Sequence, residues 1–337
     1  MPSDRHNVDM RTGFGISLTP FRETVGIPVV IRPADSYYAD RHKICYVDFS
    51  AYFPSEMNKV ELGDLLRHTT YVVKAYDEGH KYSEGSGFCI SPDGLLVTAA
   101  HVVTGRTPIQ EEDYRDPEPV LRARTRESDY TEYRPVLCGI KIAFPGPLEE
   151  PLQIDLALLA PIEKQTGLPH LPVSDEFHPV GSDVLMAGFP DEVELPLRFD
   201  KKLDMDYEPH QEREEETKKG LERIKELLMV KSGMVSHMHD LIIDPGGSQD
   251  CKLSLASYYI DNAMHSGASG GPVINNQGEV IGVITKRAVT TVSYPDLDDP
   301  NKEVPSGSAL AISASTLLDF VDRQISRGEI HHRNEST

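Results

Sequence analysis

The feature that most constrains the fold of this chain is a succession of short apolar runs separated by turn residues. Tyr71–Tyr76 is followed by Gly85–Ile90 and Leu95–Val103, with a Ser-Pro-Asp-Gly turn at 91–94. Short runs rich in Val, Ile and aromatic residues, bounded by Gly, Pro, Asn and Asp, are typical of β-strands. Because such runs recur in both halves, we predict an all-β protein built from two barrels. Further runs lie at 120–124, 133–143, 154–159, 183–190, 233–236, 252–260, 273–284 and 308–312.

Helix-like patterns are few and lie outside these runs. Glu208–Met229 is dense in charge and places apolar residues of its second half on one face, which predicts an amphipathic helix. Ser315 is a good N-cap for a last helix that ends near Ile325, and a short helix is expected over Val60–Arg67. We expect the polar tail, His331–Thr337, to be disordered.

Composition excludes several classes of partner. The chain has 337 residues and a formal net charge of −20, which argues against nucleic acid and anionic membranes because both require clustered Lys and Arg. Four cysteines without metal-type spacing indicate thiols in a reducing compartment. Residues 1–18 lack the apolar core of a secretory signal, and no apolar run approaches membrane-spanning length. We therefore expect a soluble cytoplasmic protein.

One serine is presented as a nucleophile. Ser269 lies in the run His265–Val273, with Gly267 before it and Gly270 and Gly271 after it. Glycines on both sides allow a sharp turn and a close approach of a substrate to the backbone. The hairpin predicted over 273–284, with its turn at Gly278, places this serine at the end of a strand.

A histidine and an aspartate are the natural partners of such a serine. His101 follows an apolar strand in the sequence Thr-Ala-Ala-His, and Asp155 is the only charged residue in Ile154–Leu159. A serine hydroxyl needs a base to remove its proton, and a buried carboxylate orients the imidazole that does so. Each residue alone has a structural explanation, but the three together favour nucleophilic catalysis.

These motifs resemble those of the trypsin-like serine proteases, which have the chymotrypsin fold, and in particular the HtrA-like branch. The motifs around His101, Asp155 and Ser269 occur in that family's order, and Gly85-Ser86-Gly87-Phe88 and Gly188-Phe189-Pro190 agree with it. The resemblance covers residues 68–315. It implies two six-stranded antiparallel β-barrels. The implied organisation is an N-terminal extension (1–67), a barrel with the histidine and aspartate (68–165), a barrel with the serine (166–314), and a C-terminal helix and tail (315–337). The second barrel contains a helical insertion (191–231).

The resemblance also implies the residue roles of a serine endopeptidase without cofactor or metal. His101 is the general base, Asp155 orients it, Ser269 is the nucleophile, and the N–H groups of Gly267 and Ser269 form the oxyanion hole. The implied substrate pocket consists of Ala263, Val283, Ile284 and Thr285. Digestive relatives carry an acid at the position of Ala263, so we expect small or medium aliphatic residues before the scissile bond.

Two departures from the family bear on regulation. Only 68 residues follow Ser269, which we expect to be too few for the PDZ domain usual in HtrA proteins. The insertion 191–231 falls in a loop that shapes the oxyanion hole in the family. In one interpretation, the insertion binds a regulatory protein or the body of the enzyme and sets an active or inactive state. In the other, it is a solvated surface segment without a regulatory role.

Other interpretations remain open from the sequence. Gly267-x-Ser269-x-Gly271 also fits the nucleophile elbow of α/β-hydrolases, with His331 or His332 as the later histidine. His237, His239 and Asp240 could bind a metal, although a turn with histidines is the simpler interpretation. A latent zymogen, or a protease fold kept as a binding scaffold, is the non-catalytic alternative.

Overall fold

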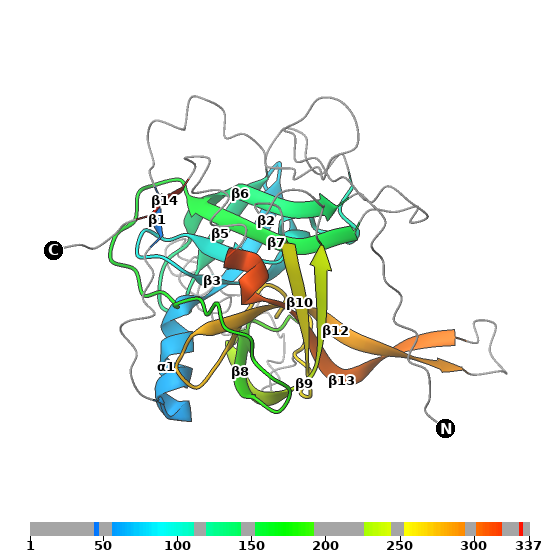
Figure 1. Ribbon diagram of the computed structural model, residues 1–337. Coiled ribbons are helices and arrows are strands. Elements are labelled where there is room, and N and C mark those ends of the chain that lie inside the picture. The colour runs from blue at the N-terminus through cyan, green and yellow to red at the C-terminus, as the bar shows by residue number, and fades with distance from the viewer. Residues whose placement is uncertain are drawn as a thin grey trace, which may run out of the picture.

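The fold consists of two closed, six-stranded antiparallel barrels (Figure 1). The structure is a computed structural model that describes residues 44–46, 56–110, 119–142, 152–191, 226–243, 253–293, 301–318 and 330–332. The first barrel has the strand order β2-β3-β4-β7-β6-β5. Its strands are β2 (Thr70–Asp77), β3 (His80–Cys89), β4 (Leu96–Thr98), β5 (Val120–Arg124), β6 (Thr131–Ile142) and β7 (Leu152–Pro161).

The second barrel has the strand order β10-β13-β12-β11-β8-β9. Two neighbouring strands, β12 and β13, continue past the barrel as a two-stranded ribbon (Figure 1). The predicted all-β architecture of two barrels is thus confirmed. The strands are β8 (Asp183–Gly188), β9 (Met229–Ile243), β10 (Leu253–Ile260), β11 (Pro272–Ile274), β12 (Val280–Ser293) and β13 (Asn301–Ser313).

Helix α1 (Lys59–Thr69) packs against both barrels. Its N-cap is Asn58, whose side chain accepts from the backbone N–H groups of Val60 and Glu61, while the Glu61 carboxylate accepts from the Asn58 N–H. This reciprocal capping box satisfies backbone donors that would otherwise be unpaired. Leu62 and Leu66 of α1 are buried in one apolar cluster with residues of both barrels, including Phe88 of β3. The helix therefore helps to hold the barrels together.

Several elements differ from the sequence-based predictions. The run Leu95–Val103 is not a single strand, because β4 ends at Thr98 and α2 (Ala100–Thr104) follows it. The charged helix does not extend to Met229, where β9 begins, and the rest of the predicted helix up to residue 225 lies outside the described residues. The tail is partly ordered, since β14 (Ile330–His332) pairs in parallel with β1 (Ile44–Tyr46).

The last predicted helix begins at Ala314, one residue before the expected cap. Residues 314–318 are helical, and the remainder of that prediction, residues 319–325, lies outside the described part of the chain. None of the helices in the described ranges is long and apolar enough to cross a membrane.

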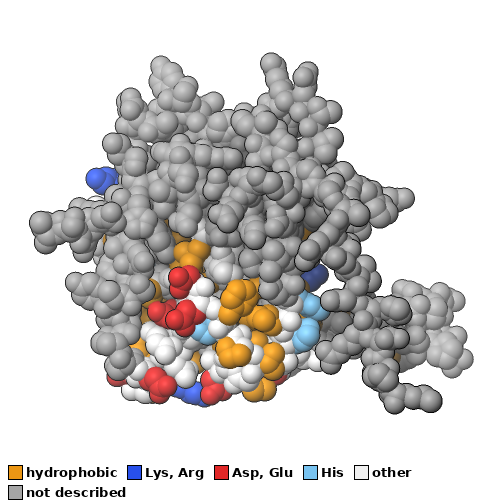
Figure 2. All heavy atoms as spheres, viewed as in Figure 1, with side chains coloured by type: hydrophobic (Ala, Val, Ile, Leu, Met, Phe, Trp, Pro, Cys, Tyr) orange, Lys and Arg blue, Asp and Glu red, His pale blue; other side chains and the backbone are white. Residues whose placement is uncertain are grey.

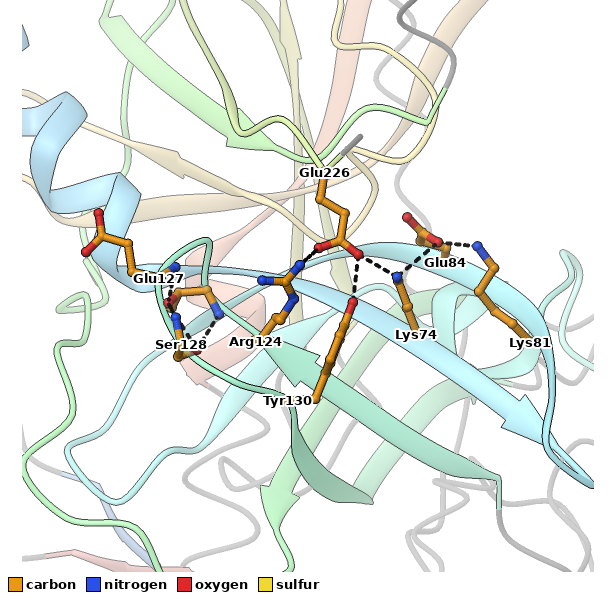
Figure 3. Close-up of polar contacts among 9 residues, drawn as sticks. Lys74, Lys81, Glu84, Arg124, Glu127, Ser128, Tyr130 and Glu226 are labelled. Carbon is orange, nitrogen blue, oxygen red and sulfur yellow. Dashed lines mark hydrogen bonds and ion pairs between the residues drawn. The ribbon is translucent and has the colours of Figure 1, made fainter. Parts of the chain in front are cut away.

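A buried ion cluster joins the first barrel to the segment that enters the second (Figure 3). Glu226, three residues before β9, accepts from Lys74 Nζ of β2 at 2.5 Å, from the Tyr130 hydroxyl at 2.7 Å, and from the Arg124 guanidinium of β5. Lys74, Arg124 and Glu226 are all less than a tenth exposed. Burial alone would lower the pKa of Lys74, but its bonds to Glu226 and Tyr130 raise that pKa above the ordinary range. The cluster therefore consists of two buried cations that share the Glu226 carboxylate, and a second, more exposed carboxylate, Glu84, lies 4.0 Å from Lys74 Nζ.

Candidate active site

A cleft of about 510 Å³ is lined by residues of both barrels. The first barrel contributes the segment around α2 and the start of β7. The second contributes residues of β10, β12 and β13 and of the serine loop, which we define as residues 261–271 between β10 and β11. This arrangement lets chemical groups from distant parts of the sequence meet at one surface. The lining residues are His101, Thr107, Ile109, Gln153, Asp155, Ser257, Met264, His265, Ser266, Ser269, Ile284, Thr285, Lys286, Arg287, Leu310 and Ile312.

His101 and Asp155 form a tightly bonded pair on the first barrel. The His101 N–H donates to Asp155 Oδ1 at 2.9 Å, and His101 Nδ1 lies 2.6 Å from Asp155 Oδ2. An ionised carboxylate only accepts, so Nδ1 carries the hydrogen of a neutral imidazole and Nε2 keeps its lone pair. Both side chains are about a quarter exposed, at 25% and 22%. The histidine is therefore oriented and presents a basic nitrogen to the cleft.

The serine loop is fixed by backbone bonds to both barrels. The Ser86 N–H of β3 donates to the Ser269 carbonyl at 2.8 Å, and the Gly270 N–H donates to the Ile284 carbonyl at 2.6 Å. Gly270 has φ +86°, and a Cβ there would lie 2.1 Å from the Ser86 carbonyl oxygen. Only glycine fits this conformation and this close approach, so the glycine after the serine is a requirement of the fold.

The Ser269 hydroxyl lies in the same cleft as the His101–Asp155 pair but is bonded elsewhere. Ser269 Oγ donates to the Thr285 carbonyl of β12 at 3.0 Å. Among the described residues, the Thr285 carbonyl is the hydrogen-bond partner of this hydroxyl, and no hydrogen bond connects the hydroxyl to His101. The structure thus brings the three predicted residues to one cleft, with the hydroxyl turned toward β12.

The peptide bond before Gly267 is oriented by the start of the insertion. The Asp191 N–H donates to the Ser266 carbonyl at 3.0 Å. In a planar trans peptide the carbonyl and the following N–H point in opposite directions, so the Gly267 N–H points away from Asp191. Gly267 has φ +86°, and a Cβ there would lie 2.5 Å from the Phe189 carbonyl oxygen. Within the described residues, the N–H groups of Gly267 and Ser269 have no hydrogen-bond acceptor.

Ser86 is a residue of the site whose function was not predicted from the sequence. Its fully buried hydroxyl donates to the Gly267 carbonyl at 2.8 Å and accepts from the Phe189 N–H at 2.8 Å. It therefore ties the serine loop to the end of β8. The available signal was a hydroxyl residue between two glycines near the end of β3, which the family resemblance noted only as a matching motif.

The cleft is lined by two of the four residues of the predicted substrate pocket. Ile284 and Thr285 line the cleft as expected. Val283 does not, because its side chain is fully buried in the core. Ala263 is also absent from the lining, and its carbonyl accepts from Lys231 Nζ of β9 at 2.7 Å. Met264, the next residue along the chain, lines the cleft instead.

Other reactive groups in the described chain are less suited to catalysis. Burial raises the pKa of the Cys89 thiol to about 12, so it is not an activated nucleophile. The rings of His237 and His239 are in edge-to-face contact at 4.5 Å, and the described residues contain no group of three metal-binding side chains. The two antiparallel barrels also exclude the α/β-hydrolase alternative, which requires a largely parallel sheet flanked by helices.

Comparison with known proteins agrees with this geometry. The sequence model described as "Trypsin-like peptidase domain" matches residues 85–283, which include His101, Asp155 and Ser269. The chain belongs to the trypsin-like peptidase domain family. The predicted resemblance to trypsin-like proteases is thereby confirmed.

Two individual relatives have low sequence identity to this trypsin-like peptidase domain. The chain is 26% identical over 221 residues to the mitochondrial serine protease HTRA2 of Bos taurus, which supports the HtrA-like assignment. That match covers 66% of this chain but only 35% of HTRA2. The inactive form of the Rv3671c protease is similar over 81% of this chain and 97% of its own, with 18% identity and a TM-score of 0.43.

Proposed function

We propose that this trypsin-like peptidase domain is a serine endopeptidase that hydrolyses peptide bonds through an acyl-enzyme. The observation that carries the proposal is the convergence of the His101–Asp155 pair and Ser269 on one cleft from different barrels. A neutral imidazole oriented by a carboxylate is the base that a serine nucleophile requires.

In the proposed mechanism, His101 Nε2 removes the Ser269 proton as Oγ attacks the carbonyl carbon of the scissile bond. The ring, now an imidazolium stabilised by Asp155, gives this proton to the leaving amine as the C–N bond breaks. Water then attacks the acyl-enzyme with the same base. The unpaired N–H groups of Gly267 and Ser269 are suited to stabilise the oxyanion, and one such donor contributes about 2.7–4 kcal/mol to barrier lowering.

We further propose that the residue before the scissile bond is small or medium aliphatic. Apolar side chains in the lining of the cleft suit such a residue. They belong to Met264, Ile284, Leu310 and Ile312. Among the described residues, Asp155 is the one acid that lines the cleft, and it is already bonded to His101. Preferential cleavage after Lys or Arg in a peptide library would contradict this specificity.

A latent enzyme is the second candidate, and one observation favours it. Because the Ser269 hydroxyl donates to Thr285 rather than to His101, catalysis requires the hydroxyl to turn toward the imidazole. Asp191, where the insertion begins, contacts Ser266 of the serine loop through its N–H and its carboxylate, so a partner bound to the insertion could shift that loop. Replacing residues 195–224 by an equally long Gly/Ser segment tests this regulation, which unchanged turnover and an unchanged response to activators would contradict.

Labelling by a fluorophosphonate probe tests the proposed catalysis. The wild type should be labelled at Ser269, and Ser269→Ala should not. Mass spectrometry of a lysate treated with each protein should show new peptide termini only for the wild type. Failure of both labelling and cleavage, also after replacement of the insertion, would contradict an endopeptidase function and favour a binding scaffold.

A further inference from the structure

The described lining of the cleft has more basic than acidic side chains, although the chain as a whole is strongly acidic. The formal net charge is −20, and on the face shown in Figure 2 the described Lys and Arg side chains are few and separated. The cleft, in contrast, is lined by Lys286 and Arg287 of β12, and the one carboxylate that the described residues contribute to its lining, Asp155, is paired with His101. Lys286 is exposed. A local basic strip in an acidic protein focuses its field on negatively charged ligands.

The basic strip lies on a strand edge that begins at the nucleophile. The Thr285 carbonyl of β12 is 3.0 Å from Ser269 Oγ. One edge of β12 pairs with β13 up to Ser293, but the pairing of the opposite edge with β11 reaches only Val283. Beyond Ile284, none of the described strands pairs with that opposite edge. Its N–H and C=O groups can therefore add an extended peptide as a further strand.

The direction of pairing decides which substrate residues meet the basic side chains. β12 runs away from Ser269 as it passes from Thr285 to Arg287. A peptide that pairs with it antiparallel runs toward Ser269, so its attacked carbonyl lies near Thr285. The residues before the scissile bond then lie beside Lys286 and Arg287. Opposite charges directly across two strands attract one another, whereas like charges repel.

We propose that this cleft selects extended peptide segments with acidic residues at the second and third positions before the bond that is cleaved. The inference rests on the proposed function only for the location of the scissile bond. Each matched charge pair should change affinity or kcat/KM by about 1.4-fold to fivefold relative to alanine. The preference should weaken strongly between about 0.05 and 0.5 M NaCl, because salt screens exposed charges.

Three peptides that differ only at these two positions, with Asp-Asp, Ala-Ala or Lys-Lys before a common valine, test the proposal. Binding to Ser269→Ala is measured by fluorescence anisotropy, and cleavage by the wild type is measured in parallel. We expect the order Asp-Asp, Ala-Ala, Lys-Lys in both. In the Ser269→Ala background, Lys286→Gln should reduce the preference and Lys286→Glu should reverse it. Lys164→Glu, which makes the same charge change at an exposed lysine outside the cleft, should preserve it.

The two proposals fail in different ways. If the wild type neither cleaves peptides nor reacts with a fluorophosphonate, while Ser269→Ala still prefers the Asp-Asp peptide, the proposed catalysis fails and the acidic selectivity stands. Equal binding of the Asp-Asp and Lys-Lys peptides overturns the selectivity, whatever the turnover. The selectivity is also overturned if none of the three peptides binds, or if Lys164→Glu changes the order as much as Lys286→Glu.

Discussion

Replacing Glu226 by glutamine tests how strongly the buried ion cluster stabilises the protein. The Glu226 carboxylate is the acceptor for Lys74, Arg124 and the Tyr130 hydroxyl, and the two cations have side-chain exposures of only 11% and 5%. Glutamine removes the negative charge and offers one oxygen to three donors. Buried Arg124 then loses its counterion, and Lys74 keeps only the Glu84 carboxylate, 4.0 Å away.

The expected loss is large because water cannot replace the lost charge. Removing one partner of a buried ion pair costs about 3–5 kcal/mol, because the other partner stays buried without a counter-charge. A matched control is Glu132→Gln, which breaks the bridge to Arg122 in a pair whose side chains are 50% and 47% exposed. Exposed pairs contribute about 0–1 kcal/mol. The loss in free energy of unfolding should therefore be several-fold larger for Glu226→Gln than for Glu132→Gln.

Urea unfolding followed by circular dichroism measures both costs, since the chain has no tryptophan for fluorescence. The triple variant with apolar residues at Lys74, Arg124 and Glu226 should recover much of the stability lost by Glu226→Gln, because it leaves no uncompensated charge. The reasoning is refuted if Glu226→Gln costs no more than Glu132→Gln, or if the triple variant is less stable than the single one.

Three shorter predictions concern single side chains. Ser86→Ala leaves the buried Phe189 N–H without an acceptor, so stability should fall by about 1–3 kcal/mol in urea unfolding, with a larger loss in kcat than in KM for a fluorogenic peptide. Cys89 should resist iodoacetamide at pH 8 until the protein unfolds, because burial raises its pKa to about 12; peptide mapping checks this. Burial lowers the pKa of His178, against the opposing effect of nearby carboxylates, so its neutral form is favoured by folding. Its contribution to stability should be present above pH about 6.5 and lost as pH falls through the folded-state pKa, and His178→Gln should reduce this acid sensitivity in unfolding midpoints.

The sequence predicted the parts of the fold that depend on local pattern. Short apolar runs separated by turns indicated the strands, because buried strands leave that pattern whatever their partners. Asp155 could be singled out because a charge inside an apolar strand needs a partner, and His101 and Ser269 through their motifs. The closure of two six-stranded barrels came from the family resemblance, since strand order is not encoded in local periodicity.

Contacts between distant segments could not be predicted. Glu226 resembles its charged neighbours in the sequence, and only the approach of β2 and β5 makes it a buried acceptor. The bridging hydroxyl of Ser86 depends on where the ends of two loops meet. Val283 was placed in the pocket by the family resemblance, but its side chain is fully buried in the core.

The division of the reactive groups between the barrels has a consequence for synthesis of the chain. His101 and Asp155 belong to the barrel that leaves the ribosome first, and Ser269 follows more than a hundred residues later. Domains generally fold as units during translation, N-terminal unit first. On the proposed mechanism, the first half of the nascent chain contains the general base but not the serine nucleophile. Hydrolysis therefore cannot start before the second barrel has been made and has packed against the first.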